Sequence, residues 1–227
     1  INCRHFRESR INTRVNNTNY EYRKRFKFNV SIANNIKNNY VPVEAGGEGH
    51  CGYLSIMAYC KENNIKLFPS DFNFTSVRNG TFYPARKLRH FIKVNLDNYG
   101  FDIFKLLIIS NPNHFKEFTN ISNSNSDEVK ETHIRNFYER LKKHNNTINS
   151  TTWIDEEMLS YISAITDKVI IVINSLRNDS NRLFIPPSIN NYNWELNNNS
   201  KRNYLLSEYV IKLYNYDNTH YKWYKEK

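Results

Sequence analysis

A glycine-rich loop that runs directly into an apolar segment is the feature that most constrains this chain. The loop, residues 46–50 (GGEGH), is followed by Cys51, and then Leu54, Met57 and Ala58 recur at helical spacing. Glycines adopt backbone conformations closed to other residues, so the N–H groups of such a loop can converge on one point. A helix that begins at Cys51 would also direct its positive dipole end at the sulfur, which favours the thiolate. A reactive cysteine fits this pattern, and so does a turn followed by a buried, inert cysteine.

Composition indicates a folded protein. The 227 residues can bury a sizeable core, and 39% of them are hydrophobic, with Tyr 16 and Phe 14. The sparse cysteines, Cys3, Cys51 and Cys60, do not form a disulfide framework and suit a reducing compartment. We therefore expect an intracellular location, the cytoplasm, or a host cytoplasm if the protein is an effector. No run of 18 apolar residues occurs, so we expect no membrane span.

The chain has a formal net charge of +10, and much of it lies near the N-terminus. Residues 1–40 form a basic arm, or an extension packed on the domain, in which arginines and lysines alternate with Tyr20, Tyr22, Phe26 and Phe28. Basic residues between aromatic ones can hold single-stranded nucleic acid, but no nucleic-acid-binding motif accompanies them. We expect a solvated basic face and no nucleic-acid partner. Residues 41–227 then form the main domain, and we interpret a chain that begins at Ile1 as a piece of a longer protein.

Periodicity predicts an α+β fold. Helices are expected over residues 51–63, 84–100, 127–144 and 153–165. Strands are expected over residues 104–110, 169–173, 183–185, 209–214 and 220–224, of which 169–173 is entirely apolar and typical of a central strand.

A cysteine nucleophile needs a histidine base that the fold brings near. Of the 7 histidines, His50 directly precedes Cys51, and neighbours in a turn do not usually face each other. Most others lie on charged helices or in loops. His220 instead follows a polar turn and opens the aromatic segment His-Tyr-Lys-Trp-Tyr, so it lies at a strand end beside a core. We select His220 as the candidate base.

These segments, in this order, resemble the ovarian tumour (OTU) family of cysteine proteases. Gly-Glu-Gly-His-Cys, residues 47–51, resembles the family's nucleophile signature, usually Asp-Gly-X-Cys. Residues 153–173 are similar to its Trp, acidic helix and hydrophobic strand, and Asn-Thr-His-Tyr, residues 218–221, resembles its C-terminal His-Tyr strand. The resemblance covers about residues 41–223. It implies a papain-like OTU fold, with a small mixed β-sheet packed between helices, and an OTU-like catalytic domain over residues 41–227.

The sequence departs from the family at two positions. Glu48 replaces the Asp that lies three residues before the cysteine, and Lys222 stands where the family often has Asp or Asn to orient the histidine. An ammonium has no lone pair to accept a hydrogen bond, so Lys222 cannot orient His220. Strand alternation puts Lys222 on the same side as His220, and we expect it to turn toward substrate or solvent. The third catalytic residue is then Glu48, Asn218 or a group near Glu21, and we choose Glu48.

The resemblance implies a deubiquitinase. Cys51 would attack the carbonyl of the ubiquitin C-terminal glycine, His220 would move the proton, and loop N–H groups would stabilise the oxyanion. The partners would be ubiquitin or polyubiquitin chains. No cofactor is expected, and Cys51, Cys60 and His50 do not match the spacing of a zinc site. Trp153 and Trp223 would border the substrate channel or, as we favour, lie in the core beneath it.

Two alternatives remain open from the sequence. One is an OTU-like module with weak or no activity that binds ubiquitin or nucleic acid through its basic surface. The other is a different papain-like amidase or peptidase with the same order of cysteine and histidine.

Overall fold

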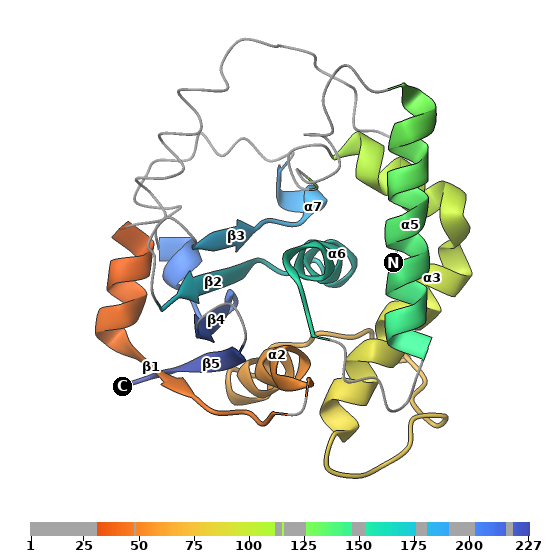
Figure 1. Ribbon diagram of the computed structural model, residues 1–227. Coiled ribbons are helices and arrows are strands. Elements are labelled where there is room, and N and C mark those ends of the chain that lie inside the picture. Colours follow the sequence, from red (N-terminus) through yellow and green to blue (C-terminus); the bar gives the residue numbers. More distant parts are fainter. Residues whose placement is uncertain are drawn as a thin grey trace.

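The computed structural model describes residues 31–47, 49–111, 115, 126–146, 153–175, 181–190, 203–216 and 220–227. Its elements in chain order are β1 (Tyr40–Val43), α2 (Cys51–Glu62), α3 (Tyr83–Ser110), α5 (Asp127–Asn146), α6 (Glu156–Thr166), β2 (Ile170–Asn174), β3 (Arg182–Phe184), α7 (Pro187–Asn190), β4 (Ile211–Tyr216) and β5 (His220–Glu226). Residues 31–39 and 203–206 are also helical. The fold is therefore mixed helix and strand, as the sequence predicts (Figure 1).

The strands form one mixed sheet of order β1-β5-β4-β2-β3. β2 and β4 run parallel, whereas the pairs β1–β5, β4–β5 and β2–β3 are antiparallel. Every residue of β2 is buried, which confirms the prediction of an apolar strand inside the sheet. β4 and β5 confirm the two predicted C-terminal strands, although β4 begins two residues later than expected.

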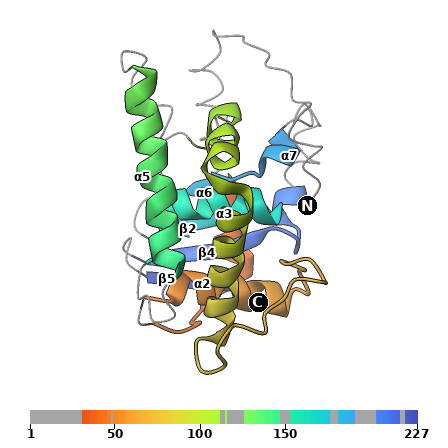
Figure 2. The ribbon, with the colours of Figure 1, turned by 90° about the vertical axis from the view of Figure 1, so that its right-hand side faces the viewer.

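Helices lie on both faces of this sheet. Alternate residues of β2 point to opposite sides: Ile170 and Val172 join the core shared with α2 and α6, and Ile171 and Ile173 join the core shared with residues 31–39. Figures 1 and 2 show α3 and α5 as an outer layer beyond α6. The helix 31–39 belongs to the segment interpreted as a basic arm, and its Ile36 is fully buried against the sheet. Residues 1–30 lie outside the described residues.

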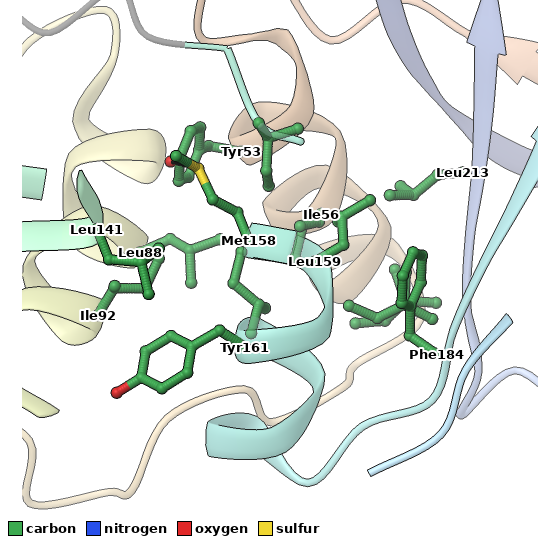
Figure 3. Close-up of a cluster of buried hydrophobic side chains, with 14 of the residues drawn as sticks. Tyr53, Ile56, Leu88, Ile92, Leu141, Met158, Leu159, Tyr161, Phe184 and Leu213 are labelled. Atoms are coloured by element: carbon green, nitrogen blue, oxygen red, sulfur yellow. Dashed lines mark hydrogen bonds between the residues drawn. The ribbon is translucent and has the colours of Figure 1, made fainter. Parts of the chain in front are cut away.

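α6 fills the space between the outer helices and the sheet. In Figure 3 its residues Met158, Leu159 and Tyr161 lie among side chains from the other elements. Side chains from the neighbouring helices and strands in this cluster are Tyr53, Ile56, Leu88, Ile92, Leu141, Phe184 and Leu213.

The start of α6 differs from the sequence expectation. The helix begins at Glu156 rather than Trp153, because the Asp155 carboxylate caps it by accepting a 2.8 Å hydrogen bond from the Met158 N–H. Trp153 therefore precedes the helix and is 50% exposed, so its expected place in the core is wrong. Trp223 is buried in the core, as favoured.

The strand expected over residues 104–110 is wrong, because α3 continues through it to Ser110. Gly100, with φ 67° and ψ 179°, interrupts the helix in a conformation that other residues rarely adopt, and the helix then resumes. In the resumed part Phe104 and Ile108 are buried, while Ile103, Leu106 and Ile109 are exposed. The buried pair is four residues apart, which is helical spacing hidden within a continuous apolar run.

β1 forms an edge of the sheet and carries a proline. The Lys227 N–H donates to the Asn39 carbonyl oxygen, and the register pairs Val41 with Lys225 and Pro42 with Tyr224. Along an antiparallel strand, every second residue directs its backbone N–H and C=O groups to the neighbouring strand. The backbone groups of Asn39 and Val41 therefore face β5, and those of Pro42 point away from the sheet. The missing N–H of Pro42 therefore costs no hydrogen bond within the sheet.

Candidate functional site

Cys51 is the first residue of α2 and follows the helix cap at His50. The His50 carbonyl accepts the first helical hydrogen bond, from the Leu54 N–H, at 2.9 Å. The preceding loop uses positive φ angles at Gly46 (124°) and Gly49 (77°). The structure thus places a glycine loop, a helix start and a cysteine together, as the sequence predicts. The thiol is buried, with 3% of Cys51 exposed.

The start of α2 lies directly against the start of β5. An ideal Cβ on Gly52 would lie 3.4 Å from Cδ2 of Tyr221 and only 2.0 Å from Cγ2 of Ile154, so the close approach requires glycine. One turn later, the Ser55 hydroxyl donates a 3.1 Å hydrogen bond to the Tyr221 carbonyl oxygen within the core. The residue after Cys51 and the residue after His220 are therefore in contact, although the sequence separates them by most of the chain.

His220 is held by a carboxylate that the sequence analysis did not consider. Nε2 of His220 lies 2.7 Å from Oε1 of Glu44, which is the residue after β1. A carboxylate only accepts hydrogen bonds, so Nε2 carries the proton and donates it. In the neutral ring Nδ1 then bears the lone pair, which can accept a proton from a donor.

Glu44 has two further partners. Its Oε1 accepts from the Gly46 N–H at 3.4 Å, and its Oε2 lies 3.5 Å from Nζ of Lys222. Partial burial raises the pKa of Glu44, but the hydrogen bonds from His220 and Gly46 and the charge of Lys222 outweigh it, so the net pKa is lowered. Glu44 therefore stays ionised and connects the base to the loop that leads to Cys51.

Lys222 does not turn simply toward solvent as expected. Its side chain is 32% exposed and points to Glu44, on the same side of β5 as His220. The alternate residues Tyr221 and Trp223 belong to the core shared with α2. Lys222 thus contacts the carboxylate that binds the imidazole.

Glu44 was missed because its only sequence signal is its place after a short edge strand. The β1–β5 register, which pairs Val43 with Trp223, puts Glu44 opposite Lys222 if it is extended by one residue. The resulting contact between Glu44 and His220 joins residues 176 positions apart and is not visible in local periodicity. The predicted third residue, Glu48, and its alternatives Asn218 and Glu21 lie outside the described residues.

His50, the histidine next to the nucleophile in the sequence, contacts the start of α3. The buried His50 ring stacks on Phe82 at the start of α3, with centroids 4.5 Å apart and an interplanar angle of 27°. Within the described part of the chain, no three His, Cys, Asp or Glu side chains come together to hold a metal ion.

Comparison with models of known protein families and with curated proteins finds no match for this chain. Among the described residues, none of the helices combines the length and apolar character that a membrane crossing requires.

Proposed function

We propose that the chain is a papain-like cysteine hydrolase with an OTU fold that cleaves peptide or isopeptide bonds at the C-terminus of ubiquitin. Cys51 is the nucleophile, His220 is the general base, and Glu44 orients the base. The observation that carries this proposal is the 2.7 Å hydrogen bond from His220 Nε2 to Glu44, because it leaves Nδ1 available for the thiol proton.

The reaction follows from these roles. In the substrate complex Nδ1 takes the proton of the Cys51 thiol, and the sulfur attacks the carbonyl carbon of the substrate. Loop N–H groups next to Cys51 stabilise the oxyanion, and each such donor contributes about 2.7–4 kcal/mol in other hydrolases. His220 returns the proton to the leaving amine, and water then hydrolyses the thioester.

The two parts of the proposal have different support. The hydrolase chemistry is supported by the helix start at Cys51, the contact between Gly52 and Tyr221, and the Glu44–His220 pair. The choice of ubiquitin is supported by the resemblance of the segments around Cys51, Trp153 and His220 to OTU proteases.

A ubiquitin probe with a C-terminal electrophile tests the whole proposal. After incubation, intact mass should show one adduct, and peptide mapping should place it on Cys51, with none on Cys60. The Cys51→Ala variant should form no adduct. If Cys51 reacts with a small alkylating reagent but never with the probe, the ubiquitin assignment is wrong and another amide substrate is indicated.

A further inference from the structure

We propose that Lys222 is a positioning residue that acts on the base through Glu44. This inference rests on the proposed function, because it assumes that His220 assists Cys51. It gives a role to a residue that stands where related proteases often carry the group that orients histidine.

The Glu44 carboxylate needs a second anchor. Its side chain is 52% exposed, so water competes for both oxygens and the side chain has rotamers that leave His220. Oε1 already receives His220 Nε2 at 2.7 Å and the Gly46 N–H at 3.4 Å. Oε2 is engaged by Lys222 Nζ at 3.5 Å. With both oxygens engaged, the carboxylate keeps the orientation in which Oε1 accepts from His220.

Lys222 cannot orient the neutral imidazole directly by accepting a hydrogen bond from it. An ammonium only donates, so Lys222 cannot receive the Nε2 proton. Lys222 can instead hold the Glu44 carboxylate, which accepts the hydrogen bond from Nε2. The charge of Lys222 also helps to keep the pKa of Glu44 below its usual value, so the carboxylate remains an acceptor at lower pH.

The same strand supplies a matched control. Lys225 lies three residues after Lys222 and pairs with Glu62 at 2.9 Å, at the end of α2 that is far along the helix from Cys51. Lys225→Met removes one lysine and one ion pair from β5, as Lys222→Met does, without touching Glu44.

The test measures the rate at which iodoacetamide alkylates Cys51, with peptide mass spectrometry used to quantify the product at a series of pH values. This measurement needs no knowledge of the substrate. For Lys222→Met we expect a rate about two- to fivefold lower near neutral pH, the size of a partly exposed ion pair. We also expect the acidic limb of the profile to move to higher pH. Lys222→Arg should restore most of the rate, and Lys225→Met should match the original protein.

A double variant tests the route of action. If Lys222 acts through Glu44, adding Lys222→Met to Glu44→Ala should lower the rate no further. A further loss, or identical profiles for Lys222→Met and Lys225→Met, would overturn the role of Lys222. If Glu44→Ala and His220→Ala both leave the alkylation rate unchanged, the proposed function itself fails, and the role of Lys222 fails with it.

Discussion

The two cysteines of α2 are almost equally buried, yet their surroundings differ. Cys51 is 3% exposed and Cys60 is 4% exposed. Cys51 begins the helix, where the N–H groups of the first turn point toward it. Cys60 lies near the other end among apolar side chains, and burial raises the pKa of its thiol to about 12. The comparison teaches that position on the helix, and not exposure, separates a candidate nucleophile from a packing residue.

Each end of α2 also lies near an ion pair that involves β5. Near Cys51, Glu44 binds His220 and Lys222. Near Cys60, Glu62 of α2 binds Lys225 at 2.9 Å. The first pair contains the imidazole of His220, which can both donate and accept a hydrogen bond, whereas the ammonium of Lys225 only donates. The two ends therefore provide a site and an internal control within one helix.

The largest expected effect comes from replacing each cysteine of α2 with alanine. Cys51→Ala should lower turnover by at least about 10³-fold, because removal of a nucleophile disables the whole catalytic group. Cys60→Ala should leave turnover nearly unchanged, since that thiol is protonated and remote from the helix start. Rates on a fluorogenic ubiquitin substrate measure both. Retained activity in Cys51→Ala would end the distinction between the two helix ends.

The carboxylates provide the next comparison. Glu44→Ala should lower turnover by about 10- to 100-fold, less than the loss of the base itself, whereas Glu62→Ala should have little effect. Glu44→Gln should recover part of the loss, because an amide oxygen still accepts from Nε2. The pKa of Glu44 is lowered in the folded protein, so its ionised carboxylate contributes to stability fully above the pKa it has in the unfolded chain, and this contribution is lost as the pH falls through the lowered pKa. Equal rates for the two Ala variants would contradict the role of Glu44.

The packing of the helix start can be tested through stability. Gly52→Ala should lower the free energy of unfolding by about 1–3 kcal/mol, because the new Cβ would lie 2.0 Å from Ile154 Cγ2. Gly47→Ala, five residues earlier, adds a Cβ that has no neighbour within 4 Å. Urea denaturation of both variants measures the difference. A Gly52→Ala protein as stable as Gly47→Ala would mean that α2 does not pack this closely against Ile154 and β5.

The last comparison concerns the far end of α2, which is held by the side chain of a buried lysine. Nζ of Lys212 donates to the Tyr59 hydroxyl at 2.9 Å and to the Ser207 carbonyl, and burial lowers the pKa of Lys212 to about 8. Between that value and its usual pKa, about 10.5, the unfolded chain binds one more proton, so this residue makes stability rise with pH.

The slope is at most about 1.4 kcal/mol per pH unit. The free energy of unfolding of the original protein, minus that of Lys212→Met, should therefore increase from pH 8 to pH 10. A constant difference across that range would show that Lys212 titrates as an exposed lysine does.

Local patterns in the sequence predicted most helices and the inner strands. α2 begins at Cys51 as expected, and β2 agrees with its apolar run to within one residue. The strand prediction for residues 104–110 was wrong because an apolar run of this length fits a buried strand as well as it fits a helix with exposed apolar residues. β1 was not predicted, since Pro42 and the short segment around it carry no clear alternation.

The candidate site was predictable only in part, for a related reason. Cys51 and His220 each belong to a local motif, so the sequence marks them. Glu44 belongs to none, and its role appears only when β1 pairs with β5. Pairings between distant strands are decided by the packing of the whole sheet, which residue-by-residue patterns do not contain.

The outward-facing Pro42 has a consequence for how this molecule behaves in a crowded solution. An edge strand invites extended chains from other molecules to pair with it, which leads to aggregation. Pro42 offers no N–H to such a chain, and this gap lies two residues from Glu44. An unfolded chain would therefore gain little stability by pairing with β1 beside Glu44. The proline therefore disfavours the pairing of a foreign strand with β1, and the side chains next to this edge of the sheet stay accessible.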